Sequence, residues 1–154
     1  MVILGKALGG GVLPVSACLA DDDIMLNIAP GEHGSTFGGF TLAARVAVEA
    51  LKFVKDEHLT EKSEKLGKVF RAEIAKIKSP YISEIRGRGL LNAVVIKPHN
   101  GKEAWDVCLE MMKNGLLAKP THRHIIRFAP PLVITEAQIK QAVKIIAKSV
   151  KSLE

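Results

Sequence analysis

The sequence predicts an α/β protein in which helices cover a short sheet, and three observations support this. The chain has 154 residues, 47% hydrophobic and 25% charged, which is typical of a soluble globular domain with a real core. From about residue 59 onward, helical apolar patterns alternate with short β-branched runs. The first forty residues do not complete a domain, and we expect them to be the end of a larger sheet.

The first part of the chain predicts two short strands and one helix. Apolar and β-branched residues favour strands over Val2–Leu4 and Val12–Leu19, with a glycine-rich stretch between them. A second glycine-rich loop, from Pro30 to Gly39, leads into a helix that ends near Glu57. Its apolar face is formed by Val46, Ala47, Ala50 and Val54.

The second part predicts three helices and four strands. Helices are expected from an N-cap at Thr60 to Ser79, from about Ala104 to an end at Asn114 and Gly115, and from Thr135, whose spacing to Gln138 is that of a capping box. The expected strands are Ile82–Arg86, Leu90–Ile96, Leu116–Lys119 and Ile125–Ala129.

Composition argues against several classes of function. The net charge is +6, but lysines alternate with acids, and one Trp and one Tyr offer little base stacking, so we expect no nucleic-acid partner. No apolar run approaches the ~20 residues of a membrane helix. Cys18 and Cys108, both in apolar surroundings, are too few and too far apart for a disulfide framework, which favours a reducing intracellular setting. His122 and His124 lack further ligands, so no metal is expected.

Lys6 is the first candidate site residue. It ends a short apolar run and directly precedes a flexible segment in the sequence LGKALGGGVLP. A lysine held in a desolvated pocket can become the free amine that attacks a carbonyl and forms a Schiff base. Taken alone, the segment favours the alternative interpretation, a surface lysine beside a loop.

The loop PGEHGSTFGG supplies two further candidates, Ser35 and Thr36. Their hydroxyls, together with glycine amides and the start of a helix, form a pattern that suits a phosphate group. An ordinary Gly/Ser turn before the helix is the alternative interpretation.

Arg127 is the fourth candidate, and it lies within the apolar run IIRFAPPLVI. Burying an unpaired guanidinium is costly, so we expect Arg127 to have an anionic partner. A substrate carboxylate fits the planar guanidinium, and an internal Asp or Glu is the alternative.

These motifs carry a family resemblance. LGKALGGGVLPVSA, GEHGSTFGG, RGRGLLNAVVI, NGLLAKPTH and IIRFAPPLVI, in this order, resemble the C-terminal portion of the class III aminotransferases that act on ornithine. The resemblance covers essentially the whole chain. It implies that 1–55 is the incomplete end of a pyridoxal-phosphate-transferase-type large domain and that 56–154 is a small C-terminal α/β domain.

The resemblance also implies roles for the four candidates. Lys6 would form the Schiff base with pyridoxal 5'-phosphate and move a proton, and Arg127 would hold the substrate carboxylate. Ser35 and Thr36 would bind the cofactor phosphate of the neighbouring subunit, so the site would be shared within a homodimer. The implied reaction transfers the δ-amino group of ornithine to 2-oxoglutarate, in the cytoplasm or the mitochondrial matrix.

Two departures from the family pattern matter. The family follows the two glycines with Asn-Pro, where this chain has Phe40 and Thr41. In the family, the aspartate that pairs with the ring nitrogen, the stacking aromatic and the other phosphate loop precede the lysine, and none of them is in this chain. We therefore expect the isolated chain to have little or no transaminase activity.

Three alternatives remain open at this point. The enzyme could act on another ω-amine, such as acetylornithine or 4-aminobutyrate. The chain could instead be a non-catalytic α/β interaction module from a truncated product. A basic anion- or RNA-binding module is the third alternative, and strong salt dependence would reveal it.

Overall fold

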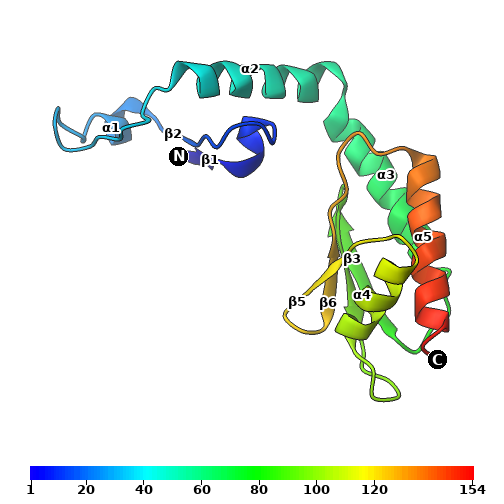
Figure 1. Ribbon diagram of the computed structural model, residues 1–154. Helices are drawn as coiled ribbons and strands as arrows, with labels where there is room; N and C mark the ends of the chain where they lie inside the picture. The colour runs from blue at the N-terminus through cyan, green and yellow to red at the C-terminus, as the bar shows by residue number, and fades with distance from the viewer. The chain divides into compact units, whose positions relative to one another are not determined.

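The computed structural model describes all 154 residues, which form two compact units, Met1–His58 and Leu59–Glu154. The mixed α/β fold expected from the sequence is confirmed, with two small antiparallel sheets and associated helices (Figure 1). None of the helices combines the length and apolar character needed to cross a membrane.

The first unit begins with a two-stranded antiparallel sheet. Strand β1 (Val2–Leu4) pairs with β2 (Ala17–Leu19), and the 3₁₀ helix η1 (Lys6–Gly9) lies in the connection. The expected strand over Val12–Leu19 is wrong except for its last three residues. The amides of Val12 and Leu13 donate to the Gly9 carbonyl in a turn, and Pro14 has no amide to contribute to a ladder.

Two helices complete the first unit. The short helix α1 (Asp22–Met25) was not expected from the sequence, whereas α2 (Thr41–Asp56) confirms the long helix. Small buried residues on α2, Ala43 and Ala47, belong to the face that packs against η1. A Cβ at Gly10, which has φ +61°, would lie 3.2 Å from Ala50 Cβ, so glycine permits this close approach.

The second unit contains a four-stranded antiparallel sheet in the order β3-β4-β6-β5. Its strands are β3 (Ile82–Arg88), β4 (Leu91–Ile96), β5 (Lys119–Thr121) and β6 (Ile125–Phe128). The expected strand over Leu116–Lys119 is wrong, because Gly115 has φ +88° and the Leu116 amide closes the preceding helix on Met111 O at 2.9 Å. Strand β5 therefore starts at Lys119, and its edge position accommodates Pro120.

Helices α3 (Leu59–Ile74), α4 (Ala104–Lys113) and α5 (Glu136–Lys151) cover one face of this sheet. The expected N-cap at Thr60 is wrong: His58, at φ +49°, ends the preceding turn, so Thr60 lies inside α3. The capping box of α5 is confirmed. The Gln138 amide donates to Thr135 Oγ1 at 3.3 Å, and the Thr135 amide donates to Gln138 Oε1 at 2.9 Å.

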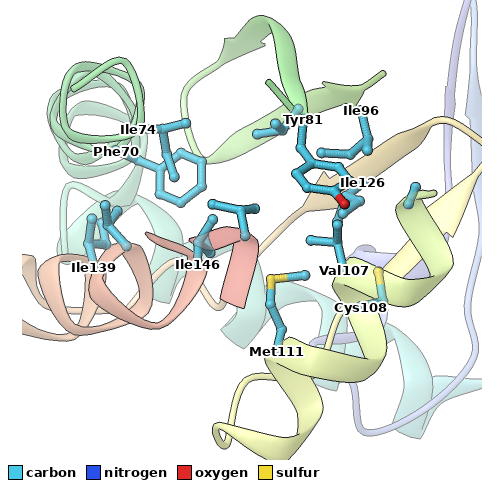
Figure 2. Packing of buried hydrophobic residues seen from close by; sticks show 14 of the residues in the cluster. Phe70, Ile74, Tyr81, Ile96, Val107, Cys108, Met111, Ile126, Ile139 and Ile146 are labelled. Carbon is cyan, nitrogen blue, oxygen red and sulfur yellow. The ribbon is translucent and has the colours of Figure 1, made fainter. Parts of the chain in front are cut away.

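The core of the second unit lies between the helices and the covered face of the sheet (Figure 2). Phe70 and Ile74 of α3 meet Ile139 and Ile146 of α5, and α4 contributes a third group beside Ile126. Tyr81 is fully buried, and its hydroxyl lies 2.9 Å from the Leu153 carbonyl and 3.1 Å from that of His99. The polar end of this aromatic side chain is therefore satisfied inside the core.

A polar network fastens the β3–β4 turn to α3. Arg71 Nη1 donates to Asn92 Oδ1 at 2.7 Å and to the Gly89 carbonyl at 3.1 Å, while the Leu90 amide donates to Ser63 Oγ at 3.0 Å. The helix approaches the turn so closely that a Cβ on Gly67 would lie 1.8 Å from the Gly89 carbonyl oxygen. This contact requires glycine at position 67 because no side chain fits there.

The two free cysteines differ in environment, which predicts different reactivity. Cys18 is exposed, contrary to the apolar surroundings expected from the sequence, whereas Cys108 is buried. Burial raises the pKa of the Cys108 thiol to about 11, so little of the reactive thiolate forms at pH 8. We expect a disulfide reagent such as DTNB to modify Cys18 rapidly in the native chain and Cys108 only after urea unfolding. Rapid release of two equivalents from the native chain would contradict this expectation.

Candidate functional site

Lys6 lies at the start of η1 with an unusual backbone conformation. Its φ is +50°, in the left-handed region that residues other than Gly, Asn and Asp rarely occupy, and it follows the extended residue Gly5. Such a conformation costs about 1–3 kcal/mol and is concentrated at functional sites. The side chain is exposed, and no hydrogen bond or ion pair involves its amine. The amine is therefore available to a ligand.

Ser35 and Thr36 lie in an exposed turn that leads toward α2. The Gly38 amide donates to the Ser35 carbonyl at 3.0 Å, and Gly39 has φ +70°. No hydrogen bond of the chain uses either hydroxyl. The turn thus presents two uncommitted hydroxyls five to six residues before Thr41.

The N-terminus of α2 also lacks a side-chain cap. Phe40 occupies the N-cap position and has no side-chain acceptor for the first amides of the helix. The helix begins at Thr41 although the chain lacks the proline of the family pattern there. Its uncapped amides are donors suited to an anion, so this segment has the chemistry that a phosphate requires.

Arg127 does not have the buried position expected from its apolar neighbours. Ile126 is buried at 1% exposure and faces the helices, whereas Arg127 points to the opposite face of the sheet and is exposed. The argument from the cost of a buried guanidinium is therefore wrong, because residues alternate between the two faces of a strand. The internal Asp or Glu partner is also absent, since no ion pair or hydrogen bond involves Arg127.

The structure groups the candidates by unit. Lys6, Ser35 and Thr36 belong to the first unit and Arg127 to the second, and no hydrogen bond or ion pair joins the three candidates of the first unit to one another. No group of three or more His, Cys, Asp or Glu side chains could hold a metal ion. A shallow depression along α3 contains none of the four candidates; it is lined by Thr60, Glu61, Glu64, Lys65, Lys68 and Val69.

Sequence reasoning missed one residue beside Arg127. Lys119 pairs directly with Arg127 across β5 and β6, so the two cationic side chains share one face of the sheet. The sequence could have indicated this pairing, because Lys119 and Arg127 are equally distant from Arg123, which lies at the middle of the hairpin. The expected strand ended at Lys119 instead of starting there, and the pairing was therefore not apparent.

With the fold and candidate residues described, comparison with known proteins defines the class. A family model described as aminotransferase class-III matches residues 1–150. The chain belongs to the class III aminotransferases. This confirms the resemblance that its motifs indicated.

The relatives within that family include several ornithine aminotransferases. The chain is 55% identical over 152 residues to the mitochondrial ornithine aminotransferase of Rattus norvegicus, covering 99% of this chain and 35% of the relative. It is 55% identical over 155 residues to the ornithine aminotransferase of Schizosaccharomyces pombe, covering 99% of this chain and 35% of that protein. The chain thus spans about a third of the length of these relatives.

Solved structures show the same fold. A crystal structure of acetylornithine aminotransferase from Elizabethkingia anophelis has a TM-score of 0.91 and 56% identity, over 97% of this chain and 38% of that one. The ornithine aminotransferase of Toxoplasma gondii has a TM-score of 0.92 and 45% identity, over 98% of this chain and 36% of that one. The mixed α/β fold is therefore that of class III aminotransferases.

Proposed function

We propose that this chain is the part of a pyridoxal-phosphate-dependent aminotransferase that supplies its reactive lysine, a phosphate-binding turn and a carboxylate-binding arginine. The observation that carries this proposal is Lys6, whose amine is exposed and has no partner and whose backbone has φ +50°. The class III family model matches residues 1–150 of the same chain. The strain at Lys6 fits a residue positioned for chemistry.

The residues present fit pyridoxal 5'-phosphate in their chemistry. The Lys6 amine can bind the cofactor's aldehyde carbon, and the hydroxyls of Ser35 and Thr36 can donate to its phosphate. The bound cofactor supplies an electron sink for the substrate's reacting carbon. Once the substrate's amine had displaced Lys6 from the cofactor, the freed Lys6 amine would hold and return the proton at that carbon, while Arg127 would orient the substrate by its carboxylate.

For the substrate pair, we propose the δ-amino group of ornithine as donor and 2-oxoglutarate as acceptor. Relatives named ornithine aminotransferase at 50–55% identity in several organisms support this choice. Acetylornithine is the second candidate donor, because the Elizabethkingia anophelis structure carries that name at 56% identity. Both reactions use a carboxylate that Arg127 can bind.

The wider setting follows from the same relatives. We propose that the site is completed in a homodimer, with Ser35 and Thr36 serving the neighbouring subunit, and that residues 1–55 and 56–154 are parts of a large and a small domain. The rat and Drosophila relatives are named mitochondrial, whereas those of the two yeasts are not. An intracellular location is consistent with these names and with two free cysteines.

A chimera tests the proposed function. The chain replaces the matching 152-residue segment of the rat relative, and the product is assayed for ornithine turnover with 2-oxoglutarate in the presence of pyridoxal phosphate. We expect turnover in the chimera and a loss of at least about 10³-fold in its Lys6→Ala variant, because the covalent amine is removed. Lys144→Ala, at an exposed lysine of α5, should leave turnover unchanged.

Two further arms make this test decisive. The 154-residue chain alone should show little or no turnover, because it spans 35% of the rat relative's length. Preference for acetylornithine over ornithine would support the second donor instead. A chimera that folds but has no turnover would overturn the proposal and favour a non-catalytic interaction module. Turnover that survives the Lys6→Ala change would overturn it as well.

A further inference from the structure

The solvent side of helix α5 carries a line of lysines. Lys140, Lys144, Lys148 and Lys151 follow one another at spacings of four, four and three residues, which places them along one side of the helix. All four are exposed, whereas the buried residues of α5 face the core on its other side. At 1.5 Å per residue, the line is about 16 Å long.

Acidic side chains do not balance this line. Helix α5 contains four lysines and one carboxylate, so its net charge is +3, half of the +6 of the whole chain. The carboxylate, Glu136, forms an ion pair with Lys140 at 2.6 Å. The other three lysines take part in no ion pair or hydrogen bond. These three, Lys144, Lys148 and Lys151, are the α5 lysine row.

The helix dipole accounts for only part of the row. Cations in the last turn of a helix stabilise its negative end, and Lys148 and Lys151 lie there. The effect falls off within one turn, so it gives no reason for Lys144. By contrast, Lys68 of α3 and Lys113 of α4 each have a carboxylate of their own helix, at 3.3 and 2.9 Å. The row is therefore a cationic surface without an internal partner.

The surface around the row lacks the side chains on which protein interfaces depend. Helices α3 and α5 pack side by side (Figure 1), and neither contributes to the large hydrophobic residues that are exposed in this chain. Helix α5 contains no aromatic residue and no arginine, the types that dominate the binding energy of protein interfaces. A cationic face without such anchors is complementary in charge to a surface that offers many negative groups, such as an anionic bilayer.

We propose that the α5 lysine row docks the chain on the surface of a lipid bilayer with anionic headgroups. The three ammonium groups bind headgroup charges, and the contact stays outside the hydrocarbon because α5 exposes no large apolar side chain to insert. Each lysine near such a surface contributes about fivefold in affinity, so the row contributes about 100-fold at low salt. The proposal is independent of the proposed enzymatic function, since the row contains none of the four candidate residues.

Vesicle binding by the full 154-residue chain tests the proposal. The chain is mixed at low salt with vesicles of equal parts phosphatidylcholine and phosphatidylserine, or of phosphatidylcholine alone, and the fraction that sediments with the lipid is measured. We expect binding to the anionic vesicles at least about tenfold tighter than to the neutral ones, and its loss at high salt. The exposed apolar residues of the first unit would bind both vesicles alike and resist salt, so these arms distinguish them from the row.

A triple variant identifies the row as the binding surface. Lys144→Gln, Lys148→Gln and Lys151→Gln together should weaken binding to the anionic vesicles about 100-fold. Arginine at the same three positions should restore it, because the charge is kept. Circular dichroism of both variants should match that of the unaltered chain, since the three side chains are exposed.

The matched control removes the same net charge elsewhere on the second unit. Three lysines that already have a carboxylate partner are changed to glutamine together, namely Lys68, Lys102 and Lys113. This variant should lose less than about fivefold in affinity, because the charge is removed outside the row.

Three results would overturn the proposal. The first is equal binding of the unaltered chain to anionic and neutral vesicles. The second is an equal loss of affinity in the two glutamine variants, which would mean that only net charge matters. The third is binding of polyglutamate or duplex RNA that requires the row, without binding of the anionic vesicles. That result would assign the row to an acidic protein or a nucleic acid.

Discussion

Replacing Gly67 with alanine is expected to destabilise the second unit by about 3 kcal/mol or more. A Cβ at this position would lie 1.8 Å from the Gly89 carbonyl oxygen and 2.3 Å from its carbon. Both are backbone atoms of a turn, so the helix and the β3–β4 hairpin must move apart, and overpacking of this kind costs about 1–3 kcal/mol or more. The gain of about 1 kcal/mol in helix propensity does not offset this.

The same change also weakens the polar network beside it. Arg71 donates to the Gly89 carbonyl and to buried Asn92, and separation of α3 from the turn lengthens both hydrogen bonds. Unfolding by urea, followed by circular dichroism, measures the loss as a lower midpoint. Gly34→Ala is the matched control, because nothing lies within 4 Å of that Cβ, and it should be neutral or slightly stabilising. Equal midpoints for the two variants would refute the argument from close contact.

Replacing Ile126 with alanine is expected to cost about 3 kcal/mol. Its side chain is 1% exposed and belongs to the cluster between the sheet and the helices (Figure 2). Truncation of a buried isoleucine removes its transfer free energy and leaves a cavity, for a total of about 2–5 kcal/mol. Because β6 pairs with β4 on one side and with β5 on the other, the loss also loosens the sheet around Arg127.

The adjacent isoleucine provides the control for this change. Ile125 belongs to the same strand but to the opposite face, and it is only partly buried. Ile125→Ala should therefore cost no more than about 1 kcal/mol. Urea midpoints of the two variants give the comparison directly, and a larger loss for Ile125→Ala would mean that the uncovered face is packed in a way that the structure does not show.

Periodicity predicted the elements that bury a continuous apolar face. Helix α5 was anticipated with its cap because Thr135 and Gln138 determine its start locally, and the face of α2 followed from its small apolar residues. Elements set by backbone geometry were missed. Lys6 and His58 both have positive φ, which neither residue type signals, so η1 was not predicted and the start of α3 was misplaced.

The residues of the candidate site also divide into those that the local sequence indicates and those that depend on backbone geometry. Lys6, Ser35 and Thr36 could be selected from their neighbours in sequence, because the chemistry of an amine before glycines and of hydroxyls before a helix is local. The exposure of Arg127 could not be predicted from its neighbours in sequence, because a difference of one residue in strand register decides which face of the sheet it occupies. Lys119 became visible only through pairing across the hairpin, which depends on where the turn ends.

The burial of Tyr81 gives the molecule an internal optical reporter. The chain contains one Tyr and one Trp, and Trp105 lies on α4 at 54% exposure, so both chromophores belong to the second unit. Phenylalanine is the aromatic residue of the first unit. Tyrosine dichroism in the near ultraviolet and tryptophan fluorescence therefore report on the four-stranded sheet and its helices. Changes around Lys6 go unseen unless a probe is attached to the exposed thiol of Cys18.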